Sequence, residues 1–228
     1  TGSALFLIAL GMVYGASGTL NMADLSLRVA QASGDQVPLL AAAGLLLLLV
    51  FALKAALLPL YFWLPRAYAS ASAPVAALFA IMTKVGIYAI LRLATLMFGA
   101  GAGELAHLTQ AWLWPLALAT VALGAVGVLA ARSLQMLLAY LVVVSAGTLL
   151  AAVASGTPQA HAAGLYYLLH STWMAGGLFL LADLITRQRG DKGGALVQGP
   201  ALQNPALLGG LFFFGAVAVI GLPPLSGF

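Results

Sequence analysis

The sequence predicts an all-α protein that crosses a membrane about seven times. Of its 228 residues, 63% are hydrophobic and only 6% are charged, whereas about 25% of the residues in a soluble domain are charged. The apolar runs are long and lack strict alternation with polar residues, which favours transmembrane helices over a β-barrel. This composition excludes a soluble enzyme.

Seven apolar segments each approach the ~20 residues that a helix needs to cross a bilayer. These predicted spans cover residues 2–18, 38–64, 73–98, 112–130, 134–154, 160–185 and 205–228. Polar loops separate them, and the longest is RQRGDKGGALVQGPALQNP at 187–205. We therefore expect an all-α transmembrane bundle.

The charges of the loops predict the orientation of the chain. Loop cations on the side where the sequence begins are Arg66, Arg132, Arg187, Arg189 and Lys192. Of the loop cations, Arg28 falls on the other side. Because cytoplasmic loops are enriched in lysine and arginine, we place the first residues in the cytoplasm.

Prolines interrupt two of the predicted spans, at 59–65 and at 222–224. A proline lacks a backbone donor and clashes with the preceding turn, so each site predicts a broken helix. The two sites are five spans apart, and this odd offset suits an inverted repeat whose broken helices mark a transport site. Proline-kinked helices without a transport role are the alternative.

Two lysines lie inside apolar segments of membrane length. Lys84 is roughly 16 Å from either end of the third span at ~1.5 Å per residue. A lysine at that depth costs roughly 2.5–3.5 kcal/mol on insertion scales, so by default it marks an ion or proton path. We expect Lys84 to be a proton relay, the alternative being a structural lysine permanently paired with a carboxylate.

Lys54 lies five residues before Pro59, near the end of the second span. A cation at this place can interact with the exposed carbonyl end of the first half-helix, and it can modulate Lys84 electrostatically. A dipole partner without a transport role is the alternative.

His170, near the middle of the sixth span, is the third candidate relay because histidine titrates close to neutral pH. Tyr88 follows Lys84 by one helical turn and Tyr166 precedes His170 by one turn, so each shares a face with its neighbour. Asp183, near the cytoplasmic end of the sixth span, is a candidate for the mouth of the proton path. The alternative for His170 is a structural histidine, and for the two tyrosines it is a packing role. The alternative for Asp183 is an interfacial position without a transport role.

The sequence predicts no cofactor, metal or nucleic-acid partner. It has no cysteine, which excludes disulfides, thiolate zinc sites and Fe–S clusters. The histidines and acids lack metal-site spacing, and no phosphate loop, nucleophile elbow or dinucleotide fingerprint is present. The net charge of +4 reflects loop arginines, without a basic aromatic groove for nucleic acid.

The segment FALKAALLPLYFWLPRAYASASAPVAALFAIMTKVGIYAILR at 51–92 resembles the antiporter-like membrane subunits that Mrp-type cation/proton antiporters share with respiratory complex I. The resemblance continues through SLQMLLAYLVVVSAG, YYLLHSTWMAGGLFLLADL and GLPPLSGF, and within the family it favours the D subunits of Mrp antiporters. It implies a subunit of about fourteen helices with two inverted five-helix repeats. Residues 1–228 would then be a single fragment covering approximately helices six to twelve.

Position by position, the resemblance matches three residues of this chain to ionisable family residues. Lys54 matches the lysine of the broken seventh helix, which in the family pairs with a glutamate of the fifth. Lys84 matches the central lysine of the eighth helix, and His170 matches the histidine of the eleventh. The resemblance implies that the glutamate and the ionisable residue of the twelfth helix fall outside this sequence.

The resemblance implies a proton-translocating subunit of a multisubunit Na+ or K+/H+ antiporter in a bacterial inner membrane. Such a subunit is a secondary transporter component without a cofactor, assembles with other subunits and supports pH and cation homeostasis. One alternative is a proton-pumping subunit of a complex I-like NADH:quinone oxidoreductase or membrane hydrogenase. A second alternative, of another class, is a structural subunit that transports nothing.

Overall fold

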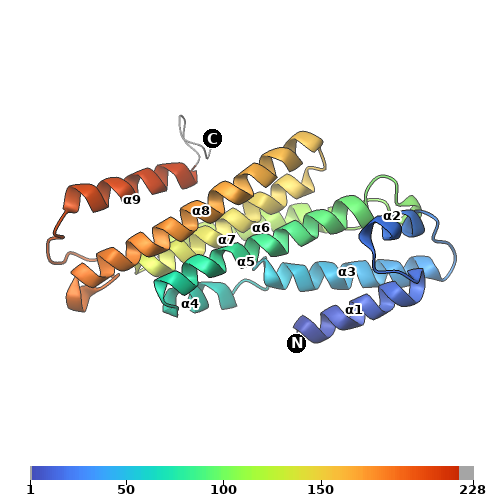
Figure 1. Cartoon of the computed structure of the whole chain (residues 1–228), viewed down its shortest axis with the longest axis horizontal. Helices are drawn as coiled ribbons and strands as arrows, with labels where there is room; N and C mark the ends of the chain where they lie inside the picture. Colours follow the sequence, from blue (N-terminus) through green and yellow to red (C-terminus); the bar gives the residue numbers. More distant parts are fainter. Residues whose placement is uncertain (1, 221–228) are drawn as a thin grey trace.

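The computed structural model describes residues 2–220, which are almost entirely helical (Figure 1). The α-helices are α1 Gly2–Ser17, α2 Met22–Ala30, α3 Gln36–Lys54, α4 Trp63–Ser70, α5 Ala73–Arg92, α6 Gln110–Ala130, α7 Leu134–Ala154, α8 Pro158–Gln188 and α9 Pro205–Ile220. A π-helical turn at Leu93–Met97 extends α5, and 3₁₀ turns lie at Gly103–Leu105 and Gly190–Lys192. Residues 2–220 contain no strand, so the all-α prediction is confirmed.

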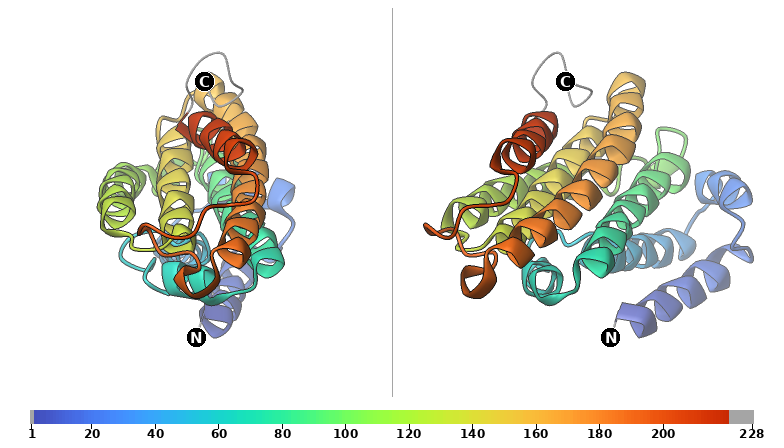
Figure 2. Two further views of the ribbon diagram at one scale, coloured as in Figure 1. Left: turned by 90° about the vertical axis from the view of Figure 1, so that its left-hand side faces the viewer. Right: turned by 60° about the vertical axis from the view of Figure 1, so that its left-hand side comes forward.

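The helices form an elongated bundle with α5, α7 and α8 at its centre (Figure 1, Figure 2). α5 packs against α3, α7 and α8, while α7 also packs against α6 and α8 also packs against α9. α1 and α9 lie on opposite sides of the bundle (Figure 1). Of the helices long enough to cross a membrane, α7 is the most buried, so polar groups on its inner face are shielded from the surroundings.

Five helical stretches within residues 2–220 are long and apolar enough to cross a membrane: α3, α5 with its π-helical turn, α6 with the preceding 3₁₀ turn, α7 and α8. α1 and α2 make a sixth if the pair, bent by 56°, is one span. α9 is a shorter apolar helix. Every predicted span therefore contains a helix, and the structure supports five or six of the seven by length.

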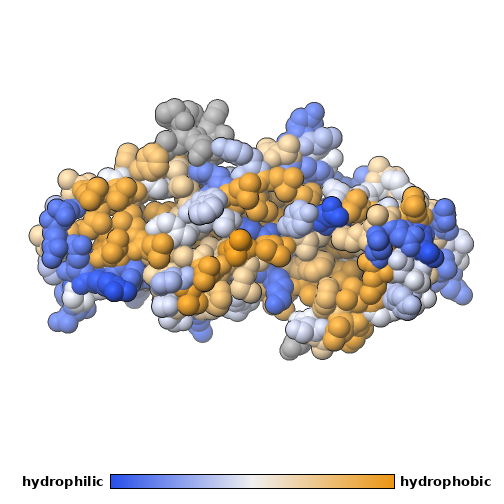
Figure 3. Space-filling model, viewed as in Figure 1, coloured by the Kyte–Doolittle hydropathy of each residue, from blue (hydrophilic) through white to orange (hydrophobic). Residues whose placement is uncertain are grey.

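Hydrophobic side chains cover wide areas of the face shown in Figure 3, while hydrophilic residues gather toward the two ends. Large apolar side chains elsewhere in the chain are also strongly exposed, as Leu129 and Trp173 are at 87% and 77%. Exposed apolar surface on this scale suits contact with lipid, since a soluble monomer rarely exposes contiguous apolar patches so large.

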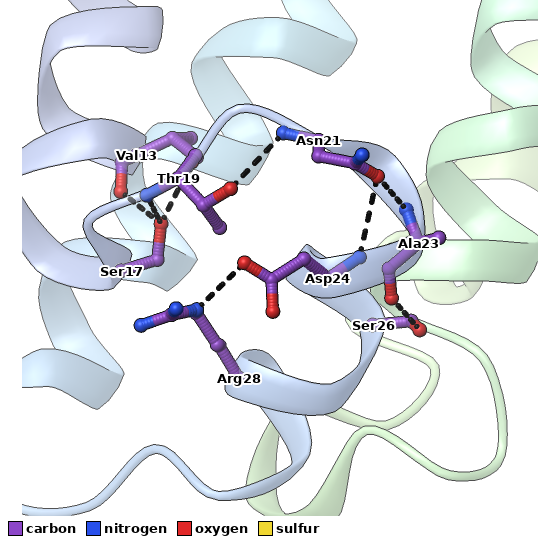
Figure 4. Close-up of polar contacts among 8 residues, drawn as sticks. All are labelled: Val13, Ser17, Thr19, Asn21, Ala23, Asp24, Ser26 and Arg28. Atoms are coloured by element: carbon purple, nitrogen blue, oxygen red, sulfur yellow. Dashed lines mark hydrogen bonds and ion pairs between the residues drawn. The ribbon is translucent and has the colours of Figure 1, made fainter.

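The segment after α1, which the sequence predicts as a loop, contains the helix α2 (Figure 4). Asn21 caps it, because its side-chain oxygen accepts hydrogen bonds from the amides of Ala23 and Asp24 at 2.9 and 3.4 Å. One turn later, Asp24 pairs with Arg28 at 2.9 Å. The cap and the i,i+4 ion pair support a helix too short and too polar to be a span on its own.

The first predicted helix break is present, but it begins earlier than its prolines. α3 ends at Lys54 and α4 starts at Trp63, so the non-helical stretch is 55–62. Pro65 is the third residue of α4 and does not break it, because the first turn of a helix does not use that amide. The second predicted break, at 222–224, lies outside the described residues.

Candidate functional site

Lys84 lies on the inner face of α5 and is 1% exposed. Its ammonium group donates a hydrogen bond to the hydroxyl of Ser145 on α7. Among residues 2–220 the two side-chain ion pairs are Asp24–Arg28 and Asp183–Arg187, so Lys84 is held there by a neutral hydroxyl and not by a carboxylate. A buried cation held in this way has no compensating negative charge among the described residues, so its burial is costly.

Ser145 connects α5 with α8. It is 5% exposed, it accepts a hydrogen bond from Lys84, and the hydroxyl of Tyr167 on α8 lies within its reach. The three helices α5, α7 and α8 contact one another, which brings these side chains together. The serine hydroxyl has one proton and two lone pairs, enough for a bond on either side.

His170 follows Tyr167 by three residues and therefore lies on the same face of α8. The centroids of the two rings are 6.3 Å apart. His170 is 8% exposed, and its Nε2 donates to the backbone carbonyl of Ala218 in α9 at 3.0 Å. Lys84, Ser145, Tyr167 and His170 thus form a line of polar side chains, defined here as the polar line, that crosses the bundle from α5 to α9.

Lys54 is the last residue of α3 and is exposed. It makes no ion pair with the described residues, and the structure does not bring it into the polar line. α5 nevertheless touches the break directly behind it, because Gly86 approaches the backbone of Ala55. Lys54 is therefore connected to the Lys84 region through packed backbone, without a direct hydrogen bond.

The break that follows Lys54 has its backbone groups held by other side chains. The indole of Trp63 donates to the carbonyl of Leu53 at 3.1 Å. The amide of Leu58 donates to the hydroxyl of Thr120 on α6 at 3.0 Å. Such partners are what a helix interrupted at membrane depth requires, because lipid cannot hydrogen-bond the freed groups.

The other three candidate residues, Tyr88, Tyr166 and Asp183, lie away from the buried part of the polar line. Tyr88 and Tyr166 are 46% and 56% exposed, so their side chains face outward from α5 and α8. Asp183 accepts a hydrogen bond from Arg187 at 2.8 Å on the outer part of α8. Their roles at the relay and the pore mouth stay predictions.

Sequence reasoning missed Ser145 and Tyr167. Ser145 is a lone hydroxyl within LLAYLVVVSAGTLL, and its depth in an apolar run was a usable signal. Tyr167 stands beside Tyr166, and spacings of three and four residues both place a tyrosine on the face of His170. Because α8 packs against α7, it is Tyr167 and not Tyr166 that comes close to Ser145.

No group of three or more histidine, cysteine or acidic residues could hold a metal ion within 2–220. What the polar line offers is a sequence of proton donors and acceptors: an ammonium, two hydroxyls and an imidazole. Each of these groups can take part in proton exchange. Such a line is chemically able to pass a proton inside an apolar bundle.

The chain is similar to known proteins over its whole length. The family described as "NADH:quinone oxidoreductase/Mrp antiporter, TM" matches residues 1–228. The D subunit of a probable K(+)/H(+) antiporter of Rhizobium meliloti (strain 1021) is 43% identical over 99% of the chain and 45% of its own length. The D subunit of the Na(+)/H(+) antiporter of Bacillus subtilis (strain 168) is 40% identical over the same shares.

Solved structures place the same fold in two kinds of complex. A chain of the Mrp complex from Dietzia sp. DQ12-45-1b superposes with a TM-score of 0.81 at 30% identity, covering 100% of this chain and 41% of that one. A chain of respiratory complex I from Thermus thermophilus with bound NADH gives 0.82 at 30% identity, covering 100% and 47%. The chain spans less than half the length of these relatives. It belongs to the transmembrane family that NADH:quinone oxidoreductases and Mrp antiporters share.

Proposed function

We propose that this chain is part of the proton-translocating D subunit of a multisubunit Na+ or K+/H+ antiporter in a bacterial inner membrane. The observation that carries the proposal is the Lys84 ammonium, 1% exposed inside a spanning helix and hydrogen-bonded across to another helix. The names of the relatives at 43% and 40% identity support the antiporter branch. The protein is then a transporter component, and the other subunits of the antiporter are its partners.

In the proposed mechanism Lys84 takes up and releases a proton at the centre of the bundle. His170 passes the proton toward α9, whose carbonyl at Ala218 already binds its ring. Lys54 acts from the helix break: a second positive charge nearby disfavours the protonated state of Lys84. Inward proton flow drives cation export, which helps to hold the cytoplasmic pH in alkaline conditions.

The experiment measures antiport by the full-length protein assembled in its complex, in everted membrane vesicles. In wild type, a preformed pH gradient is expected to collapse when Na+ or K+ is added. Lys84→Ala is expected to abolish the collapse while the amount of assembled complex stays the same. Lys192→Ala is the matched control, because Lys192 is an exposed loop lysine, and it is expected to behave as wild type.

Three outcomes would overturn the proposal. Cation-dependent collapse that persists in Lys84→Ala would leave this lysine structural. If it also persisted in Lys54→Ala and His170→Ala, the non-transporting structural subunit would be the better assignment. A wild-type complex that ignores both cations would instead favour a redox-driven pump.

The second candidate is such a pump: a proton-pumping subunit of a complex I-like oxidoreductase, favoured by the TM-score of 0.82 to the Thermus thermophilus chain. The same residues would move protons, and redox chemistry in other subunits would supply the energy. Proton pumping that starts on addition of an electron donor, and not of a cation, distinguishes this candidate from the antiporter.

A further inference from the structure

We infer that Ser145 and Tyr167 are the hydrogen-bonded relay that carries the proton between Lys84 and His170. This inference rests on the proposed function, to which it adds two residues that carry the proton. It makes the polar line a route from α5 to α8 through α7.

The contacts of Ser145 support a relay better than they support a structural anchor. An anchor for a permanently charged lysine would be a carboxylate, or several acceptors that together replace the water shell. Among the described residues Lys84 instead donates to a neutral hydroxyl, 5% exposed, and the Tyr167 hydroxyl lies within reach of that serine. Lys84, Ser145 and Tyr167 therefore follow one another as neighbouring polar groups on α5, α7 and α8.

Within residues 2–220, the space beside Ser145 is too small for a chain of waters. A cavity of about 20 Å³ adjoins this serine, lined by α7, α8 and α9. Its polar lining residues are Ser145 and Ser171, and the remainder are apolar. A buried water needs two to four polar partners, so one water fits there at most, and Tyr167 provides the better-connected way onward.

The proton step keeps each hydroxyl neutral before and after. An Nζ–H proton of Lys84 moves to the oxygen of Ser145 while the serine's own proton moves to the oxygen of Tyr167. The phenolic proton of Tyr167 then passes to the Nδ1 of His170, whose ring centroid is 6.3 Å from that of Tyr167 and whose Nε2 faces Ala218. The net change is that neutral Lys84 and protonated His170 replace protonated Lys84 and neutral His170. Reorientation of the two hydroxyls resets the chain.

The position of Tyr167 offers a matched internal control. Tyr166 is the next residue on the same helix but is 56% exposed and outside the polar line. On α7, Thr148 is one turn after Ser145, and it is exposed and bonded to its own helix at Val144. Removing the hydroxyl of Tyr166 or Thr148 therefore makes the same kind of chemical change on the same two helices, but outside the polar line.

The test uses the full-length protein in its complex, in everted vesicles, with rates normalised to assembled complex. The variants are Ser145→Ala, Ser145→Thr and Tyr167→Phe, with Tyr166→Phe and Thr148→Ala as controls. Ser145→Ala and Tyr167→Phe are expected to lower the maximal rate of cation-dependent gradient collapse by at least about tenfold, the scale of a lost proton-transfer group. The half-saturating cation concentration is expected to stay unchanged. Ser145→Thr, which keeps a hydroxyl, is expected to restore most of the rate.

The inference fails if Ser145→Ala or Tyr167→Phe transports within about twofold of its control. It also fails if Ser145→Thr is as slow as Ser145→Ala, because side-chain size and not the hydroxyl would then matter. Lys84→Ala in the same assay separates the relay from the proposed function. An inactive Lys84→Ala beside an active Ser145→Ala removes only the relay, whereas an active Lys84→Ala removes the proposed mechanism itself.

Discussion

Gly86 of α5 lies against the backbone of Ala55, the first residue after α3. A Cβ atom on Gly86 would be 2.8 Å from the Ala55 nitrogen and 3.1 Å from its Cα. The missing side chain is therefore what allows the helix that carries Lys84 to touch the helix break beside Lys54. This contact joins the two predicted lysine sites more closely than any hydrogen bond does.

Gly86→Ala is expected to force α5 and the break apart. Overpacking of this kind typically costs about 1–3 kcal/mol, and backbone atoms cannot move aside as a flexible side chain can. The measurement is the thermal stability of the purified complex, together with its antiport rate. Gly177→Ala is the control, because an added Cβ on Gly177 has no atom within 4 Å. Equal stability of the two variants would contradict the close contact.

Thr120→Val is expected to weaken the support of the break. Thr120 is fully buried and accepts from the amide of Leu58, and valine keeps its shape while removing that acceptor. A buried amide left without a partner costs about 1–3 kcal/mol. Hydrogen exchange at residues 55–62 is expected to speed up, whereas Thr148→Val, on an exposed position, is expected to change nothing there. Unchanged exchange in Thr120→Val would show that another group holds the amide.

Lys54→Ala is expected to slow antiport less than Lys84→Ala does. Lys54 is exposed. In the proposed mechanism it acts on Lys84 only through its charge, whereas Lys84 carries the proton. The double variant is expected to be no slower than Lys84→Ala alone, since residues that act through one another have non-additive effects. Rates measured in vesicles from the four forms check this. An additive loss in the double variant would mean that the two lysines act independently.

Asn21→Ala is expected to fray α2 by removing its cap. Loss of an N-cap side chain costs about 0.5–2 kcal/mol, and the local signature is faster hydrogen exchange of the amides of Ala23 and Asp24. Asn21→Asp keeps an acceptor oxygen and is expected to retain protection. If both variants exchange alike, the capping bonds in Figure 4 do not stabilise the helix.

The sequence was most informative where a residue conflicted with its apolar surroundings. The depth of Lys84 in its span predicted a buried cation, and the structure places it at 1% exposed. His170 was likewise expected near the middle of α8, and it is buried there. Such a conflict can be recognised from the sequence without knowing which side chains the residue contacts. The free energy cost of a charge in lipid depends mainly on its depth, and depth follows from the position of the residue in its span.

The partners of these residues could not be predicted in the same way. Ser145 meets Lys84 only because of the register of α7 against α5, and an apolar helix shows too little periodicity to fix that register. The choice of Tyr167 over Tyr166 depends on the same packing. α2 was missed for another reason: a search for long apolar runs does not detect a nine-residue amphipathic helix.

The two hydrogen bonds at the broken helix bear on how this protein can move. Trp63 ties the end of α3 to the start of α4, and Thr120 fastens the intervening loop to α6. A bend held at both a carbonyl and an amide is restrained against opening. The proposed mechanism needs no opening there, because protons can pass between hydroxyl groups while the helices around them keep their places.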